Sequence, residues 1–297
     1  MTASRLLLAS VIKERICAYL SFQDIVNLRD ALGLSSLKVP ILVTDFQNKQ
    51  IIFPGVNSTT LVANELIKQY GCDLALIKAA EINQNKVIQI LLTAKDIDVN
   101  AVNRYEQSAL MSAALNNRNL IVQILLTSKD INIQNKNAAL MVAVGNGHDE
   151  VVKTLLTTKE ININAINQIG DTALILATEY RQDEVVQTLL AAKDIDVNVA
   201  GRTGQTALMV ASLYGLYLIV KNLIIVKNIN INAVDHNGNT ALMLAAFNNQ
   251  ISIVQTLLTV QNINVNTTNR FGKTALMLAA GSHRQEIIEY LKAHGAL

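Results

Sequence analysis

The stretch DHNGNTALMLAA, residues 235–246, decides how this chain folds. It places Gly238 two residues before Thr240, and Thr240 directly before a run of small and apolar residues. A threonine hydroxyl accepts a backbone N–H in the first turn of a helix, and a glycine suits a turn that needs a positive φ angle. The stretch therefore predicts a tight turn followed by a short helix that begins after Thr240.

Variants of this stretch recur along the chain at a nearly constant spacing. The leucine of its Ala-Leu pair stands at Leu76, Leu110, Leu140, Leu174, Leu208, Leu242 and Leu276. The numbers of successive leucines differ by 34, except for a difference of 30 between Leu110 and Leu140. A second apolar signature, I/V-x-x-x-L-[LI] or a close variant, follows at the same offset each time, through the contraction as well. Two signatures in one register indicate seven repeated units.

Each unit is expected to hold two short helices and a projecting turn. Ser or Thr stands before the first helix at Ser108, Thr172, Thr206, Thr240 and Thr274. Alanines keep this helix thin, so that neighbouring units can stack closely. The second signature has apolar residues at helical spacing, as in residues 253–258, and a turn such as Ile229-Asn230-Ile231-Asn232 follows it.

At these residues the chain resembles the ankyrin repeat family, whose pattern runs D-x-x-G-x-T-P-L-H-x-A-A. Alanine stands here for the family proline, methionine for the histidine, and the glycine that usually ends the second helix is missing. The resemblance implies an all-α ankyrin-repeat solenoid of seven repeats with short β-turn fingers over residues 73–297. A small helical N-terminal region, residues 1–72, would precede it.

The third unit is shorter than the others by four residues. In this unit Leu140 follows Asp130 by 10 residues, whereas in the second unit Leu110 follows Asp96 by 14 residues. Neither helix signature is shortened, so the missing residues are those of the finger tip. We expect an unbroken helical stack with a shortened turn here, beside fingers that have lost a pairing partner. The alternative is a harmless deletion in a surface loop.

The N-terminal region is expected to begin with two or three helices over residues 4–34. A short hairpin around Asn48-Lys49 (residues 39–46 and 50–53) and a helix over residues 60–70 should follow. The first stretch resembles an F-box, which docks on the Skp-type adaptor of cullin-RING ubiquitin ligases, although Ala9 replaces the hallmark proline and the basic-aromatic ending is absent. The adaptor-docking residues implied by that resemblance are Leu8, Ile12, Ile16, Leu20 and Ile25. The alternative is a helical cap that covers the first repeat.

Composition excludes several function classes. Hydrophobic residues make up 51% of the 297 residues, and 25 Lys and Arg against 23 Asp and Glu leave a net charge of +2, which is not the basic footprint of a nucleic-acid-binding protein. No apolar run approaches the roughly 20 residues of a membrane span. The apolar stretch Leu6–Ile12 is interpreted as part of an amphipathic helix, with a secretion signal as the alternative. Two cysteines and four histidines fit no metal site or catalytic constellation, so we expect no enzyme, cofactor or metal.

What remains is a surface for binding a protein. The ankyrin family binds partners through its finger tips and through first helices that line a concave face. The two positions after the alanine pair of the first helix bring together Tyr180, Leu213, Tyr214 and Phe247 on units four to six. These residues either bind a partner or pack on neighbouring first helices. The finger-tip candidates are Arg104, Tyr105, Arg202, Arg270 and Phe271.

Two function classes follow. The first is a non-catalytic scaffold or adaptor that binds a partner protein through the concave face and the finger tips. The second is an F-box and ankyrin substrate receptor that recruits a target to a cullin-RING ubiquitin ligase. We expect a monomer in the cytoplasm, or in a host cytoplasm if the source is an intracellular bacterium or a virus.

Overall fold

The computed structural model describes residues 43–45, 50–52, 58–94, 97–158 and 160–297. It divides the chain into two compact parts, Met1–Glu65 and Leu66–Leu297. Strands β1 (Val43–Asp45) and β2 (Gln50–Ile52) pair antiparallel, with Val43 opposite Ile52, and α3 (Ser58–Tyr70) follows them. The expected hairpin and the expected helix over residues 60–70 are therefore confirmed. The helices expected within residues 4–34 lie outside the described residues, and the domain boundary expected after residue 72 stays a prediction.

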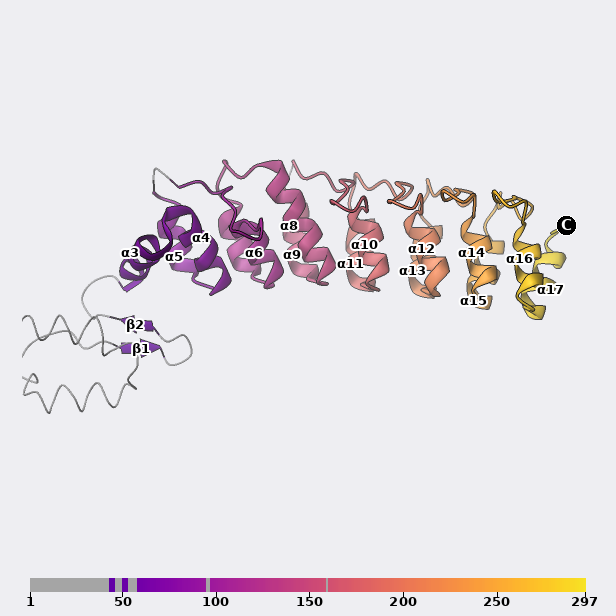
Figure 1. Ribbon diagram of the computed structural model, residues 1–297, viewed down its shortest axis with the longest axis horizontal. Coiled ribbons are helices and arrows are strands. Elements are labelled where there is room, and N and C mark those ends of the chain that lie inside the picture. Colours follow the sequence, from indigo (N-terminus) through magenta and orange to yellow (C-terminus); the bar gives the residue numbers. More distant parts are fainter. Residues whose placement is uncertain (1–42, 46–49, 53–57, 95–96, 159) are drawn as a thin grey trace, which may run out of the picture. The chain divides into compact units, whose positions relative to one another are not determined.

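From Cys72 onward the chain forms seven consecutive helix pairs, which stand side by side in a row (Figure 1). Consecutive first helices pack on one another, and so do consecutive second helices. The expected all-α repeat architecture is confirmed. The pairs, numbered here as units one to seven, are α4 (Cys72–Glu81) with α5 (Asn85–Leu91), α6 (Ala109–Leu115) with α7 (Asn119–Leu125), α8 (Ile133–Gly145) with α9 (Asp149–Leu156), α10 (Ala173–Glu179) with α11 (Asp183–Leu190), α12 (Ala207–Tyr214) with α13 (Tyr217–Ile224), α14 (Ala241–Phe247) with α15 (Ile251–Leu258), and α16 (Ala275–Gly281) with α17 (Gln285–Ala293).

The core of the repeats is aliphatic and runs along the whole row. Ala113, Ala177 and Ala245 of the first helices have no exposed surface, so consecutive first helices approach closely. The second helices bury a face of valines, isoleucines and leucines, as in Val152 and Leu155 of α9. Burial of such side chains stabilises each unit mainly through its neighbours, as in other solenoids.

The predicted serine and threonine caps are present. Each of these hydroxyls accepts the backbone N–H three residues further on, at 3.2–3.5 Å, in five first helices. The glycines two residues before the threonines have positive φ angles, for example 78° at Gly238. In the finger of unit two, Glu106 takes this position with a φ of 59°. We name the five fingers by their residues: 101–108, 165–172, 199–206, 233–240 and 267–274.

A ladder of asparagine side chains ties every unit except unit two to the unit that follows it. In unit four, Asn198 Nδ2 donates to the carbonyl of Asn228 and Asn198 Oδ1 accepts from the N–H of Asn230, both at 2.7 Å. Asn100, Asn164, Asn232 and Asn266 make the same pair of bonds to backbone atoms 29 to 32 residues further on. Gln134 stands at the equivalent position of unit two and lies in α8 instead.

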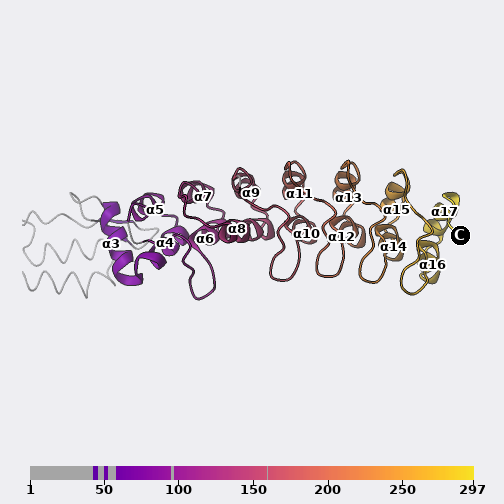
Figure 2. The same cartoon turned by 90° about the horizontal axis from the view of Figure 1, so that it is seen from above.

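Unit three has no finger at all. The helical stack passes through it unbroken, as predicted, but the prediction of a shortened turn before the first helix is wrong. The chain instead enters α8 at Ile133 and continues for 13 residues, so the helix extends toward the level of the fingers (Figures 1 and 2). Ala138, which stands where other units carry the capping Ser or Thr, cannot cap a helix. Asn132 caps α8 six residues earlier, since its side chain accepts the N–H of Asn135 at 2.8 Å.

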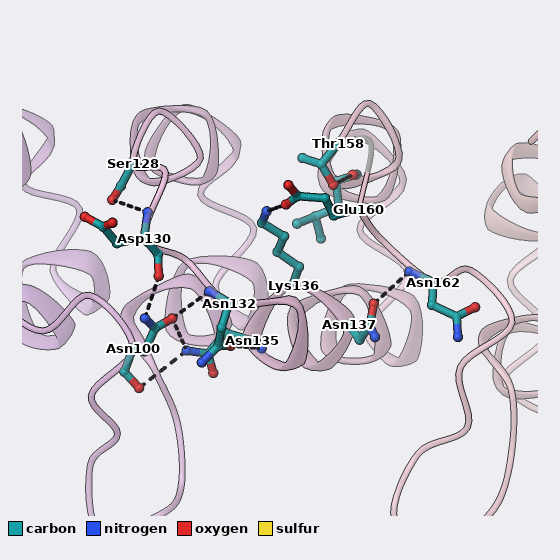
Figure 3. A network of polar contacts seen from close by, with 11 residues as sticks. Asn100, Ser128, Asp130, Asn132, Asn135, Lys136, Asn137, Thr158, Glu160 and Asn162 are labelled. Atoms are coloured by element: carbon teal, nitrogen blue, oxygen red, sulfur yellow. Dashed lines mark hydrogen bonds and ion pairs between the residues drawn. The ribbon is translucent and has the colours of Figure 1, made fainter.

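The additional turns of α8 are bonded to both neighbouring segments (Figure 3). Asn135, which is buried, donates to the side-chain and backbone oxygens of Asn100 at 3.1 and 3.4 Å. On the other side, buried Lys136 forms an ion pair with Glu160. Asn137 Oδ1 accepts the N–H of Asn162 at 3.0 Å and so supplies the bond that Gln134 does not make. These contacts explain why the shortened segment is helical.

Candidate protein-binding surface

Three aromatic side chains stand at the C-terminal ends of consecutive first helices, Tyr180 and Tyr214 at one repeat position and Phe247 one residue earlier. Tyr180 caps the C-terminus of α10, Tyr214 is the last residue of α12, and Phe247 is the last residue of α14. These three residues are 59%, 50% and 53% exposed, in that order, whereas Leu213 is half-buried. We call Tyr180, Tyr214 and Phe247 the aromatic row.

The helix ends explain why these rings are open. The alanines before them, such as Ala177 and Ala245, are buried against the neighbouring helices, whereas the three rings stand where the helices end and keep at least half of their surface exposed. An exposed aromatic ring of this kind is typical of interface centres, since it offers a large apolar area at a low entropy cost.

Glu179, which directly precedes Tyr180, has a carboxyl group whose charged form is disfavoured. Burial raises the pKa of Glu179, the negative charge of Asp171 raises it further, and Arg202 acts in the opposite direction. Asp171 is itself buried, and its Oδ2 lies 3.9 Å from Arg202 Nε. The Glu179 carboxyl, next to Tyr180 in the chain, therefore takes up a proton more readily than an ordinary surface glutamate would, because its pKa is raised.

The finger-tip candidates form a second band. Arg104 stacks on Tyr105, with the guanidinium carbon 4.7 Å from the ring centre, and Tyr105 is 64% exposed. Arg202 and Arg270 are exposed at the tips of their fingers, and Phe271 is 74% exposed.

The sequence-predicted residues do not form one patch. The fingers enter the first helices at their N-termini, whereas the aromatic row lies at the C-terminal ends, about 10 Å away along a seven-residue helix. Within the finger band, the missing finger of unit three separates Tyr105 from Arg202, Arg270 and Phe271 (Figure 2).

Two features of this surface escaped the sequence reasoning. Ile166 is 62% exposed on finger 165–172, although it is an ordinary aliphatic residue in a repetitive pattern. Gly201 replaces the Asn or Asp that begins the turn in other fingers, and the carboxylate of Asp171 occupies the vacated space by accepting the N–H of Arg202 at 3.2 Å. The substitution at residue 201 was the signal that could have revealed this exchange.

The described residues bring no three His, Cys, Asp or Glu side chains together as a group that could hold a metal ion. Among the helices described, none is both long enough and apolar enough to cross a membrane.

Comparison with known proteins agrees with the geometry. The crystal structure of the ankyrin repeat domain of Bcl-3, a member of the IκB protein family, matches with a TM-score of 0.67 at 21% identity, over 73% of this chain and 97% of that chain. At that identity the match shows the fold alone. No curated protein sequence matches the chain.

The family model of ankyrin repeats matches three times, over residues 56–137, 128–201 and 208–296. These matches cover most of the chain. Domains of this kind generally mediate protein–protein interaction and are typically non-catalytic. The chain belongs to the ankyrin repeat family.

Proposed function

We propose that this chain is a non-catalytic scaffold or adaptor that binds a partner protein through its concave face and its finger tips. It acts as a monomer in the cytoplasm, or in a host cytoplasm if the source is an intracellular bacterium or a virus. The aromatic row is the observation that carries this proposal. Tyr180, Tyr214 and Phe247 are each at least half exposed and are carried by three neighbouring first helices.

The size of the row suits an interface centre. A buried aromatic side chain covers about 150–250 Å², so the open half of one ring is worth about 2 kcal/mol when a partner covers it. Glu179 adds a polar group at the edge of the row. Arg202 and Arg270 at the finger tips supply guanidinium groups that can bind carboxylates of the partner.

Substitution of the row tests the proposal. The partner is first isolated by affinity purification on the wild-type protein, and its affinity is then measured for Tyr180→Ala, Tyr214→Ala and Phe247→Ala. Each variant should weaken binding by about 1–3 kcal/mol while the melting temperature stays near that of the wild type. Ile225→Ala is the matched control, because Ile225 is 79% exposed at the C-terminal end of α13, outside the row, and should bind as the wild type does.

The opposite result is equally clear. If the melting temperature falls steeply while the folded fraction binds with unchanged affinity, the three rings stabilise the stack and do not form the site.

The F-box-like pattern at Leu8, Ile12, Ile16, Leu20 and Ile25 favours a second function, that of a substrate receptor for a cullin-RING ubiquitin ligase. These residues lie outside the described part of the chain, so this proposal rests on their order in the sequence. A purified Skp-type adaptor should bind the full chain and should not bind a chain that lacks residues 1–34. If no adaptor binds and the deletion causes the repeats to aggregate, the segment is a cap.

A further inference from the structure

Three exposed nitrogen-bearing side chains stand at one position of three consecutive fingers. Arg202, His236 and Arg270 are each the second residue of the four-residue turn at the tip of their finger, and these fingers lie side by side (Figure 2). We call the three residues the basic row. In the described part of the chain the row makes a single ion pair, between Arg202 Nε and Asp171 Oδ2, whose separation of 3.9 Å is too long for a hydrogen bond. The N–H groups of these side chains are therefore open to a partner.

Backbone contacts fix the spacing of the basic row. The N–H of His236 donates to the carbonyl of Thr203 at 3.1 Å, and the N–H of Arg270 donates to the carbonyl of Asn237 at 2.9 Å. The tips also approach closely, since a Cβ atom at Gly238 would lie 3.0 Å from the backbone nitrogen of Arg270. Neighbouring members of the row are therefore one repeat apart, about 8–10 Å, which is the distance between packed helices.

The fingers that carry the basic row have an excess of positive charge. Their charged residues are Arg202, Asp235, Arg270 and Lys273. Asp235 is buried, and its Oδ1 accepts the N–H groups of Asn237 and Asn239, both at 2.8 Å, so this carboxylate is used within its own turn. The three cationic residues are exposed. Charge complementarity therefore favours a partner segment that presents carboxylates to the finger tips.

The spacing of the row favours one conformation of that segment. A polyproline II helix has three residues per turn and a rise of about 3.1 Å per residue, so every third side chain lies on one face, about 9.3 Å from the last. Side chains on one face of a β-strand are only about 6.5–7 Å apart, which does not match the row. An α-helix presents every seventh residue on one face at about 10.5 Å, but its backbone groups are bonded internally.

The residues beside the basic row distinguish these two helices. Thr203, Asn237 and Phe271 directly follow its members in the chain and are exposed. The Thr203 hydroxyl and the Asn237 amide can bond to the backbone of a polyproline II segment, which has no internal hydrogen bonds. Phe271, 74% exposed, offers an aromatic face of the kind on which proline residues of such segments pack.

We propose that the basic row, together with Thr203, Asn237 and Phe271, binds an acidic polyproline II segment of a partner protein, with Asp or Glu at every third position and proline between them. Each carboxylate accepts N–H groups from one member of the row. A segment of seven residues, about 19 Å long, spans the row. The inference rests on the proposed function and deepens it, since it names the chemistry of the segment that the finger tips bind.

The probe is a dye-labelled synthetic peptide, Glu-Pro-Pro-Glu-Pro-Pro-Glu with blocked termini, titrated with the full-length protein at low salt and followed by fluorescence anisotropy. The comparison peptide, Glu-Glu-Glu-Pro-Pro-Pro-Pro, has the same composition and charge, but its carboxylates are grouped. Because the grouped peptide cannot reach all three members of the row at once, the spaced peptide should bind about fivefold more tightly.

Substitutions in the row test the contacts. Arg270→Gln and Arg202→Gln should each weaken binding of the spaced peptide by about two- to fivefold, as expected for one exposed ion pair, with an unchanged melting temperature. Arg104→Gln is the matched control and should bind as the wild type does. It removes the same charge at the same turn position of finger 101–108, which lies beyond the unit without a finger.

A charge exchange tests the register. Arg270→Glu should repel the spaced peptide, and a lysine in place of either its first or its last glutamate should restore binding to within about twofold of the wild-type pair. The end at which lysine restores binding gives the direction in which the segment runs along the row.

Several results would overturn the proposal: equal or tighter binding of the grouped peptide, equal weakening by Arg104→Gln and Arg270→Gln, or no restoration by either lysine peptide. Tighter binding of a seven-nucleotide single strand would identify a nucleic-acid site, and tighter binding of a helical peptide with glutamate at every seventh residue would identify a helix as the occupant. Since Tyr214→Ala should leave peptide binding unchanged, failure of this titration leaves binding by the aromatic row standing.

Discussion

Between the two helices of every unit, one residue adopts a positive φ angle. Gly147 and Gly215 fill this position at no steric cost, and asparagine fills it in three other units. Arg181 and His283 hold it with φ angles of 57° and 56°, although neither residue has the short side chain that eases this conformation. The turn is therefore imposed by the packing of the two helices and not by the local sequence.

Arg181→Gly is expected to raise the free energy of unfolding by about 0.5–1 kcal/mol. The left-handed conformation costs a residue with a Cβ atom roughly 1–2 kcal/mol, and glycine removes this cost. Part of the stability gained in this way is offset, because glycine has greater conformational freedom in the unfolded chain. Urea unfolding measures the change. Asn249→Gly, at the same turn position of unit six, should gain less, because asparagine tolerates the conformation better. A destabilised Arg181→Gly variant would show that the arginine side chain outweighs the backbone strain.

Gly201 and Asp171 have exchanged roles at the boundary between units four and five. Gly201 lacks the side chain that begins the turn in other fingers, and the carboxylate of Asp171 accepts the N–H of Arg202 in its place. A Cβ atom at Gly201 would lie 2.3 Å from Asp171 Oδ1. At the equivalent pair two units later, Asn269 Nδ2 donates to Asn239 Oδ1 at 2.8 Å. Either arrangement connects the fingers, but a mixture of the two does not fit.

Gly201→Asn alone should therefore destabilise the protein, and Asp171→Asn added to it should recover part of the loss. The double variant reproduces the Asn239–Asn269 pair. We expect a coupling energy of about 1–2 kcal/mol in a double-mutant cycle of urea unfolding. Effects of the two substitutions that add without coupling would contradict the exchange.

At the scale of the element, α8 shows how a deletion can lengthen a helix. Once the finger is lost, the backbone from Asn132 to Ala138 needs other hydrogen-bond partners, and a helix supplies them internally. The Lys136–Glu160 pair then holds the added turns. The hydrogen bond from Lys136, followed by its positive charge, lowers the pKa of Glu160 below its ordinary value of 4.5.

Acid should loosen this extension. A carboxyl group whose pKa is lowered by folding stabilises the folded state above its unfolded value of 4.5, and this contribution is lost as the pH falls through the lower, folded value. Between about pH 5 and pH 3, the wild type should therefore lose more unfolding free energy than Glu160→Gln does. Glu184→Gln is the control and should follow the wild-type curve, because Glu184 is an exposed residue of α11 for which no ion pair is found among the described residues. Identical curves for the wild type and Glu160→Gln would show that the pair adds nothing to stability.

At the scale of the whole molecule, the asparagine ladder couples every unit except unit two to the unit that follows it. Asn198→Ala removes two bonds to the backbone of unit five and should lower the unfolding free energy by about 1–2 kcal/mol. Asn266→Ala removes bonds to Gly295 and Leu297 only and should mainly increase hydrogen exchange at the last residues. If the two variants lose the same global stability, the ladder does not transmit it from unit to unit.

The sequence allowed most of this architecture to be predicted because the pattern repeats. Seven aligned leucines and the Ser and Thr caps predicted the helix pairs correctly, since each signal occurs in several units. The helical extension of α8 was missed because four lost residues are compatible with a short turn as well as with a helix. Asn132, a good N-cap six residues before Ala138, distinguishes the two only after the turn is known to be absent.

The candidate site was harder to predict for the same reason. Tyr180 and Tyr214 could be placed on one helix position from the repeat period, but their exposure depends on neighbouring helices. The exchange between Asp171 and Gly201 depends on three-dimensional contact between units, which no single repeat encodes.

The asparagine ladder has a consequence for how such a chain can change over generations. The ladder side chains of Asn164, Asn198, Asn232 and Asn266 bond only to backbone atoms of the following unit, so these bonds do not depend on which side chains that unit carries. A gene segment that encodes one whole unit could therefore be duplicated or lost by recombination, and the new neighbours would re-form the same bonds at the new junction. Selection could then lengthen or shorten the binding surface without first redesigning the joints between its parts.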